Sequence, residues 1–267
     1  MTRTTVAGGE GLRDLLVVAD THLTRRDEDL SAFVEFLLSR GAAASAVAHL
    51  GDLFNVWLGR PRFQMEHMAT VLNAFRMLRA RGVRTYLTEG NRDFNARRWE
   101  AGSAFDEVAE ESMDLVVAGR RVRLAHGDLV NTADRQYRAW RRLARSRPAQ
   151  AVLGLLPSRA GVRLAERLEE RLRGTNTRHK SYFPLESAHS WGEAAHREGC
   201  QFVFVGHFHE ERTIGLSPGE EGDPGGARMI VLPDWRSSNR YLYLAPDGSC
   251  GLESWHGSSG GAAPSAG

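Results

Sequence analysis

Five short blocks of polar residues, each directly after an apolar run typical of a strand, are the feature that most restricts how this chain can fold. They are Asp20-Thr21-His22, Gly51-Asp52, Gly90-Asn91-Arg92-Asp93, His126-Gly127-Asp128 and Gly206-His207-Phe208-His209. Ligands gather at the carboxyl ends of strands in open α/β sheets. Glycines in such blocks let the backbone turn sharply and approach a ligand closely. We therefore expect a fold that brings the five blocks to one site.

Strand-like and helical stretches alternate along most of the chain. Helices are expected at 30–40 and 64–81, where Met68, Leu72 and Phe75 follow a helical spacing. Strands alternating with helices, and then strands in pairs, are typical of a layered α/β fold. The expected strands cover residues 15–19, 46–50, 85–88, 115–117, 122–125, 202–205, 229–232 and 241–244.

The segment from residue 130 to residue 183 interrupts this alternation. It is predicted to form two helices, 133–146 and 161–173, joined by an apolar loop at 151–156 with the sequence AVLGLL. Between Leu129 and Ser181 there are 13 basic residues and four acidic ones. Such a run is usually a solvated helix face, but beside an apolar loop it also suits binding of an anionic amphiphile.

With 267 residues, the chain can hold a core and an inserted subdomain. We predict a core of residues 13–129 and 184–256, an inserted basic helical lid at 130–183, and disordered ends at 1–12 and 257–267. No apolar run resembles a signal peptide or approaches the roughly 20 residues that span a bilayer. Cys200 and Cys250 lack a metal-binding or redox spacing. We therefore expect a cytoplasmic protein.

The blocks together offer the ligands of a dinuclear metal site. Asp, Asn and His side chains without cysteine suit divalent manganese, iron or zinc, and manganese is our expectation. Two such ions about 3.5–4 Å apart can clamp a phosphate and activate a nucleophile, with one carboxylate as a bridge. Any single block has an ordinary explanation, but the ordered set of five predicts a phosphoesterase. The expected ligands are Asp20, His22, Asp52, Asn91, His126, His207 and His209.

The blocks resemble the signature of the calcineurin-like metallophosphoesterases, D-x-H, G-D, G-N-H-[DE], H and G-H-x-H. The resemblance implies a four-layer αββα sandwich with two facing sheets. It also implies a division of the ligands, in which Asp20, His22 and His209 bind one metal, Asn91, His126 and His207 bind the other, and Asp52 bridges them.

A narrower family fits better, because position 92 is arginine where most of the superfamily has a histidine that protonates the leaving group. The sequence GNRDF at 90–94 resembles the UDP-2,3-diacylglucosamine hydrolases of lipid A biosynthesis. Trp57, Tyr137, the Asp234-Trp235 pair and the basic helical insert strengthen the likeness, which covers about residues 14–245. It implies cleavage of a UDP-linked diacyl sugar to UMP and 2,3-diacylglucosamine 1-phosphate, at the inner face of the cytoplasmic membrane.

Two catalytic candidates lie in the third block. The Arg92 guanidinium cannot donate a proton near neutral pH, but it can stabilise charge on a pyrophosphate through paired hydrogen bonds. Asp93 is expected to orient its neighbours, with an ordinary turn residue as the alternative. For the lid arginines a solvated helix face fits as well as a phosphate contact. The candidate substrate contacts are Asn91, Arg92, Asp128, Tyr137, Arg171, Arg173, Asn176 and Lys180.

Two positions depart from the narrower family, and they leave the substrate open. Phe208 stands where threonine is usual, and Asn55 stands where an acidic residue is common. Neither removes a ligand, but both alter the surroundings of the substrate. A soluble nucleotide or phosphodiester is therefore the alternative substrate, and a non-catalytic scaffold on the same fold is a weaker one. We do not expect nucleic acid binding, because the basic segment has few aromatic residues for stacking.

Overall fold

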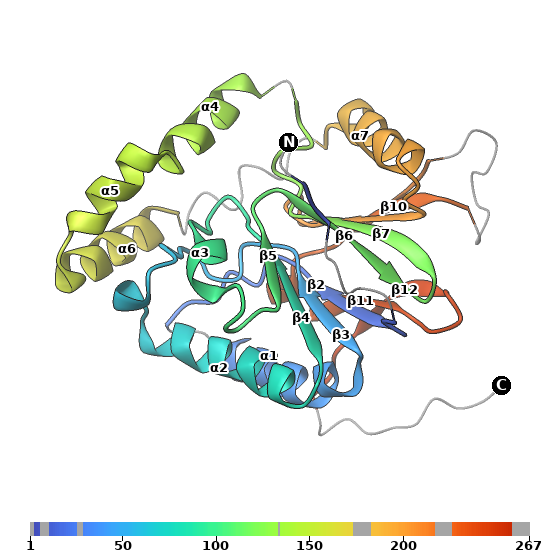
Figure 1. Cartoon of the computed structure of the whole chain (residues 1–267), viewed down its shortest axis with the longest axis horizontal. Coiled ribbons are helices and arrows are strands. Elements are labelled where there is room, and N and C mark those ends of the chain that lie inside the picture. Colours follow the sequence, from blue (N-terminus) through green and yellow to red (C-terminus); the bar gives the residue numbers. More distant parts are fainter. Residues whose placement is uncertain are drawn as a thin grey trace.

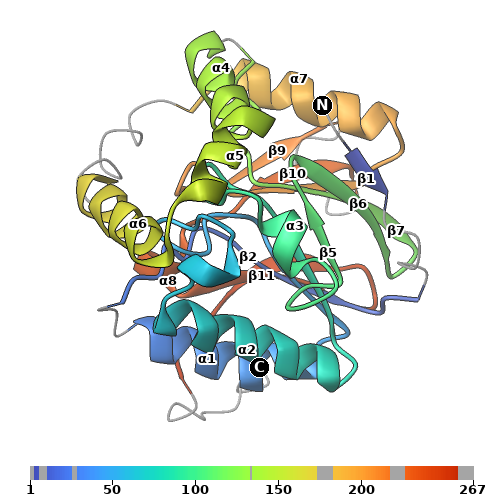
Figure 2. The ribbon, with the colours of Figure 1, turned by 60° about the vertical axis from the view of Figure 1, so that its left-hand side comes forward.

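Two sheets lie face to face between layers of helices in this chain (Figures 1 and 2). The computed structural model describes residues 3–5, 11–25, 29–132, 134–172, 183–216 and 226–257. Helices α1 and α2 cover the outer face of one sheet, and α7 covers the outer face of the other. The predicted αββα sandwich is therefore confirmed.

The first sheet contains the strands that follow the amino-terminal blocks. Its order is β12-β11-β2-β3-β4-β5, with β2 to β5 parallel and β11 antiparallel to both of its neighbours. Helices α1 (Asp29–Ser39) and α2 (Glu66–Ala80) pack on it. The strands are β2 (Leu15–Val18), β3 (Ala46–His49), β4 (Arg84–Thr88), β5 (Glu107–Ala109), β11 (Arg240–Leu244) and β12 (Cys250–Ser254).

The second sheet has the order β1-β6-β7-β8-β10-β9. Its central strands β7, β8 and β10 are parallel, and helix α7 (Leu185–Arg197) packs on them through Ala188 and Ala195. The strands are β1 (Arg3–Thr5), β6 (Ser112–Val117), β7 (Arg120–Ala125), β8 (Phe202–Val205), β9 (Arg212–Gly215) and β10 (Arg228–Val231). Short helical turns complete the core at η1 (Gly41–Ala43), η2 (Pro61–Phe63), α3 (Ala96–Glu100) and α8 (Trp235–Ser238).

Strand alternation explains why the central strands are apolar on both faces. Successive side chains of a strand point to opposite faces of the sheet. In β2, Leu15 and Val17 enter the apolar cluster between the two sheets, whereas Leu16 and Val18 enter the cluster beneath α1 and α2. Both faces of the sheet are covered at β2, so this strand has a continuous rather than an alternating apolar sequence.

The expectation of disorder at residues 1–12 is wrong for part of that segment. Arg3–Thr5 forms the edge strand β1, which pairs in parallel with residues 112–114 of β6. Leu12 is buried and forms a bridge with Val117. Main-chain hydrogen bonds to a sheet edge order such residues whatever their side chains, so a polar composition did not reveal them. Residues 1, 2, 6–10 and 258–267 lie outside the described part of the chain.

The expected apolar loop at 151–156 is also wrong, because most of it is helical. Helix α5 (Arg147–Leu155) begins at Ser146, whose side chain accepts a hydrogen bond from the Ala149 amide, and a proline lies in its first turn. These are ordinary start signals of a helix. Its neighbours are α4 (Arg135–Ala144) and α6 (Ser158–Leu172), which extend along one side of the core (Figure 1). Among the described residues, no helix has the length and apolarity to cross a membrane.

Candidate metal centre

All five polar blocks lie at the carboxyl ends of strands. Asp20 follows β2, Asp52 follows β3 and Asn91 follows β4 in the first sheet, whereas His126 follows β7 and His207 follows β8 in the second. The blocks of the two sheets are joined by hydrogen bonds between side chains and the main chain, from the His207 amide to Asp20 Oδ2 at 2.7 Å and from His126 Nδ1 to the Leu50 carbonyl oxygen at 2.6 Å. The site is therefore built across both sheets.

A first group of metal-binding side chains consists of Asp20, His22 and His209. The Nε2 atoms of the two histidines are 3.2 Å apart. Asp20 Oδ1 lies 3.5 Å from His209 Nε2 and 3.8 Å from His22 Nε2. One donor atom from each residue lies within 4.8 Å of the others, which is close enough for a single ion.

A second group surrounds His126. Its Nε2 atom lies 3.1 Å from Asn91 Oδ1, 3.2 Å from His207 Nδ1 and 3.7 Å from Asp52 Oδ1. The other oxygen of Asp52, Oδ2, lies 3.8 Å from His22 Nδ1 in the first group. The Asp52 carboxylate therefore stands between the two groups, with one oxygen near each.

These side chains fit a pair of divalent cations. Asp20 Oδ1 and His22 Nδ1 are buried and have no hydrogen-bond partner in the described part of the chain. A buried polar atom without a partner costs about 1–3 kcal/mol, and more when it is charged. A cation between the converging atoms would remove this cost for Asp20 Oδ1. The donor set contains only oxygen and nitrogen, which suits manganese, iron or zinc.

Backbone strain is concentrated at the same residues. Five of the seven candidate ligands have left-handed backbone angles, a conformation that costs a residue other than glycine about 1–3 kcal/mol. Such strain persists only where the surrounding structure enforces it, and it gathers at functional sites. The φ values are 52° at Asp20, 45° at His22, 53° at Asp52, 71° at His207 and 55° at His209.

Two glycines allow the loops to approach one another. A Cβ atom on Gly90 would lie 2.2 Å from Asp52 Oδ1, and one on Gly51 would lie 2.7 Å from His126 Nδ1. Gly51 also has a φ of 85°, which disfavours any side chain. Gly51 and Gly90 are therefore required because the loop after β3 lies in close contact with the loop after β4 and with His126.

Hydrogen bonds behind the ligands fix their orientation. His126 Nδ1 donates to the Leu50 carbonyl oxygen at 2.6 Å, so in the neutral ring Nε2 carries the lone pair that faces Asn91. Asp93 Oδ2 accepts from the Asp52 amide at 2.7 Å and from the Gly90 amide at 3.0 Å. Asp93 thus joins the loops after β3 and β4 and positions the Asp52 carboxylate.

The local electrostatics favour the metal-binding protonation state at three of the ligands, Asp20, His22 and His207. The shifts at the other titratable ligands run the opposite way: burial raises the pKa of Asp52, and nearby carboxylates outweigh burial and raise the pKa of His126 and of His209. Burial alone would raise the pKa of Asp20, but His209, His126 and His22 together lower it well below its ordinary value, which keeps Asp20 ionised. Burial lowers the pKa of His22, and burial with the nearby His126 lowers that of His207 to about 4. A carboxylate and neutral imidazoles are the forms that bind a cation.

Arg92 is buried beside Asp52. Its amide donates to Asp52 Oδ1 at 2.9 Å, and its Nε atom lies 3.6 Å from Asp52 Oδ2. The guanidinium Nη1 donates to Asn55 Oδ1 at 2.6 Å, and Asn55 Nδ2 donates to the Glu169 carbonyl oxygen of α6 at 3.3 Å. Asn55 therefore orients Arg92. In the sequence, only the departure from the narrower family at position 55 pointed to this residue.

Of the other predicted substrate contacts, Asp128 and Tyr137 lie together, and Arg171 lies on a different helix from Tyr137. The Tyr137 hydroxyl of α4 donates to Asp128 Oδ2, and Arg141 Nε forms an ion pair with the same oxygen at 3.0 Å. These contacts attach α4 to the block after β7. Arg171 is exposed on α6. Arg173, Asn176 and Lys180 lie outside the described residues.

Two further residues were absent from the predicted site. Arg145 Nη2 donates to the carbonyl oxygens of Gly90 and Asp93, both at 2.8 Å, and so supports the loop after β4. Asp234 Oδ2 lies 3.9 Å from His209 Nδ1. Arg145 is one of six arginines between positions 135 and 147, and nothing in the sequence distinguishes it from the others.

Comparisons with known proteins agree with this geometry. The family model described as calcineurin-like phosphoesterase matches residues 14–211. The UDP-2,3-diacylglucosamine hydrolase of Stutzerimonas stutzeri (strain A1501) is 33% identical over 88% of this chain and 96% of its own length. The proteins of the same name from Aeromonas salmonicida (strain A449) and Vibrio cholerae serotype O1 (strain ATCC 39315 / El Tor Inaba N16961) are 31% and 28% identical. They cover 86% and 85% of this chain, and 89% and 93% of their own lengths.

Proposed function

Because the chain belongs to the calcineurin-like phosphoesterase family, whose members are metal-dependent hydrolases, we propose that it cleaves the pyrophosphate of UDP-2,3-diacylglucosamine. The products would be UMP and 2,3-diacylglucosamine 1-phosphate. The observation that carries this proposal is the arginine at position 92, buried beside the Asp52 carboxylate between two groups of metal-binding side chains. Relatives that bear this activity in their names match most of the chain and support it.

The seven candidate ligands would hold two divalent ions. Asp20, His22 and His209 form one group, and Asp52 stands between that group and His126. Asn91 and His207 complete the second group through their contacts with His126. When bound, such ions polarise a phosphoryl oxygen and generate a nucleophile at neutral pH. Every donor is oxygen or nitrogen, which suits manganese, iron or zinc, and of these we propose manganese.

Arg92 is proposed to stabilise negative charge on the pyrophosphate. Its guanidinium stays protonated at all physiological pH values and presents several donors in one plane. Asn55 holds one side of this group, which limits the entropy lost when substrate binds. A phosphate monoester is a good leaving group, so the reaction needs no acid at this position. Asp93 contributes by positioning the amides of Asp52 and Gly90.

The helices α4 to α6 are proposed to act as a lid that receives the acyl chains. An apolar cluster of Val56, Leu58, Phe63 and Ala165, with Leu153, Leu156, Leu164 and Leu168 packed around it, joins α5 and α6 to the core. Asn55 connects this region to Arg92. We propose that Asp128, Tyr137, Arg171, Arg173, Asn176 and Lys180 contact the substrate from the lid and its base.

Membrane contact is part of the same proposal. On α5 the side chains of Val152 and Leu155 are 65% and 84% exposed. Exposed apolar side chains on a basic helical segment are typical of proteins that bind an anionic lipid surface. We propose a peripheral position on the inner face of the cytoplasmic membrane, where a diacyl substrate would be found.

The test is turnover of UDP-2,3-diacylglucosamine by the manganese-loaded protein, with UMP release followed by chromatography. UDP-glucose and a chromogenic phosphodiester serve as soluble substrates, and Asp52→Ala controls for a contaminating hydrolase. We expect the diacyl compound to have the highest kcat/KM of the three. Equal or faster cleavage of a soluble substrate would instead assign the protein to soluble nucleotides or phosphodiesters.

A further inference from the structure

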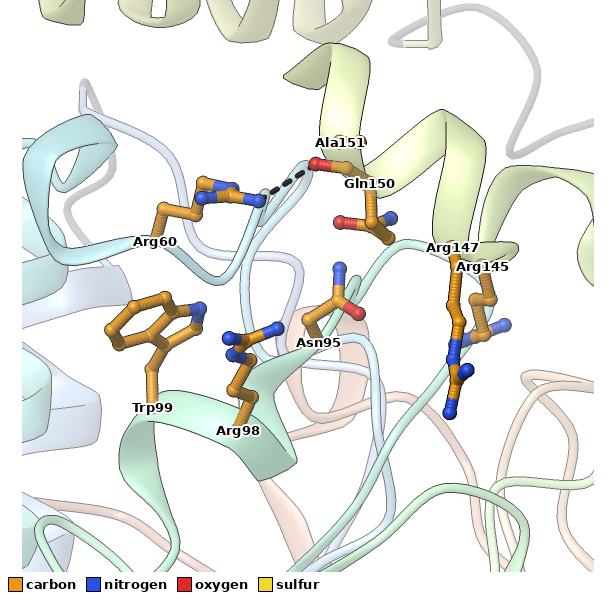
Figure 3. A pocket seen from close by; sticks show the side chains of 8 residues that line it. All are labelled: Arg60, Asn95, Arg98, Trp99, Arg145, Arg147, Gln150 and Ala151. Atoms are coloured by element: carbon orange, nitrogen blue, oxygen red, sulfur yellow. Dashed lines mark hydrogen bonds between the residues drawn. The ribbon is translucent and has the colours of Figure 1, made fainter. Parts of the chain in front are cut away.

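A second pocket, rich in arginine, lies between α3 and the junction of α4 and α5. It has a volume of about 350 Å³. None of the seven candidate metal ligands lines it, so it is separate from the metal centre. Figure 3 shows the side chains of Arg60, Arg98 and Asn95 grouped around the same opening, with Arg145 and Arg147 beside them. The remaining lining residues are Trp99, Gln150 and Ala151.

Three hydrogen-bond donors in this lining have no partner in the part of the chain that the structure describes. Arg60 Nε, Asn95 Nδ2 and Arg145 Nη1 are buried atoms that donate to no acceptor among the described residues. Buried donors are normally satisfied, and an unsatisfied one costs about 1–3 kcal/mol. These three donors indicate that the pocket is shaped for an acceptor.

The pocket also has an uncompensated positive charge. Among the described residues four arginines line it, and no carboxylate does. Only Arg145 forms an ion pair in the described structure, with Glu89 at 3.3 Å. Burial and the nearby positive charges of Arg62 and Arg98 lower the pKa of Arg60. Guanidinium groups that line one pocket repel one another, and a bound anion would reduce this repulsion.

We propose that this pocket binds a phosphate group and is a second anion site of the protein. Arginine guanidinium groups bind phosphate through paired, charge-assisted hydrogen bonds. The donors of Arg60 and Asn95 supply further bonds, and Trp99 provides an apolar wall for the group that carries the phosphate. Two sources share this chemistry, a free phosphate ester and the headgroup of an anionic phospholipid. The exposed side chains of Val152 and Leu155 follow Ala151 on α5, so a lipid surface that binds them would lie beside the pocket.

The site is connected to the metal centre. Arg145 Nη1 has no acceptor among the described residues, whereas Arg145 Nη2 donates hydrogen bonds to the carbonyl oxygens of Gly90 and Asp93. An anion that binds Nη1 would therefore stiffen the loop that carries Asn91 and Arg92. This contact through Arg145 exists whichever substrate the metal centre hydrolyses.

The first arm of the test uses glycerol 1-phosphate as the soluble probe. Its binding to the manganese-loaded full-length protein is measured by titration calorimetry for the wild type, the double variant Arg98→Gln/Arg147→Gln, and the control Arg142→Gln. Arg142 is exposed on α4 and does not line the pocket. Any binding at the metal centre is common to all three proteins, so differences between them isolate the pocket.

The second arm uses vesicles of phosphatidylglycerol mixed with phosphatidylcholine, and binding is followed by sedimentation. We expect the double variant to bind at least one of the two probes about ten-fold more weakly or worse, because it loses two charged donors. A loss confined to glycerol 1-phosphate assigns the pocket to a soluble ester, and a loss on vesicles assigns it to a headgroup. Equal binding of both probes by the wild type and the double variant overturns the proposal, as does an equal loss in Arg142→Gln.

Discussion

The substitution Arg92→Ala tests the chemistry of the metal centre most directly. The side chain that it removes is buried, donates to Asn55 Oδ1 at 2.6 Å and has its Nε atom 3.6 Å from the carboxylate that stands between the two metal groups. Loss of one preorganised donor to a transition state reduces kcat by about 10²–10³, or about 2.7–4 kcal/mol. We expect a decrease of this size in the turnover of UDP-2,3-diacylglucosamine.

Substitution of the Arg92 side chain leaves its main-chain contact with Asp52 in place. Its amide, not its side chain, donates to Asp52 Oδ1, and this bond is retained in every variant except proline. Arg92→Lys should recover little activity, because an ammonium is a point charge that cannot reproduce the planar arrangement of donors. Arg92→His should behave differently, since it restores a general acid and favours esters with poor leaving groups.

The assay measures kcat and KM at matched metal content, determined for each variant by elemental analysis. Arg123→Ala is the matched control, because Arg123 is also buried and ion-paired but contacts Asp114 at the far side of the second sheet. The control should lower the melting temperature and leave kcat unchanged. If Arg92→Ala with both metals bound hydrolyses the diacyl substrate at the wild-type rate, Arg92 takes no part in the reaction and the pyrophosphatase proposal loses its main support.

Three other predictions follow from the described contacts. Asp52→Ala should lose metal and activity together, because the two oxygens of the Asp52 carboxylate face the two ligand groups. Elemental analysis and turnover measure the two losses, and full activity of this variant after chelation would exclude the two-metal site. Val152→Ser/Leu155→Ser should weaken vesicle binding without loss of stability, whereas Leu153→Ser should lower the melting temperature, because Leu153 packs in the apolar cluster; unchanged sedimentation with vesicles would contradict membrane contact through α5. Burial lowers the pKa of His49 to about 3. Between about pH 6.5 and pH 3 the unfolded chain therefore binds one more proton at His49 than the folded chain does. The free energy of unfolding that neutral His49 contributes is thus lost as the pH falls through this range. Urea unfolding in chelator should therefore show a shallower pH dependence for His49→Gln, and identical slopes for both proteins would refute this.

The sequence by itself determined the elements that carry the site. The continuous apolar run at 15–18 is a strand because it is covered on both faces, and the polar block after it ends the strand. The ligand types and their glycines are also local features, so the class of chemistry followed from short motifs. Local signals for α5 were present as well, in Ser146 and the proline after it, but its apolar composition led to the expectation of a loop.

Only the tertiary structure decided which of these features meet. His22 and His209 are 187 positions apart, and they approach because strands of two different sheets end at one site. The left-handed backbone angles at Asp20 and Asp52 are sparsely populated in an isolated segment and persist because the surrounding structure enforces them. Asn55 and Arg145 act through contacts 37 to 114 positions away. The physical reason is that spacing along a chain specifies neighbours within an element, whereas the packing of sheets and helices selects partners between elements.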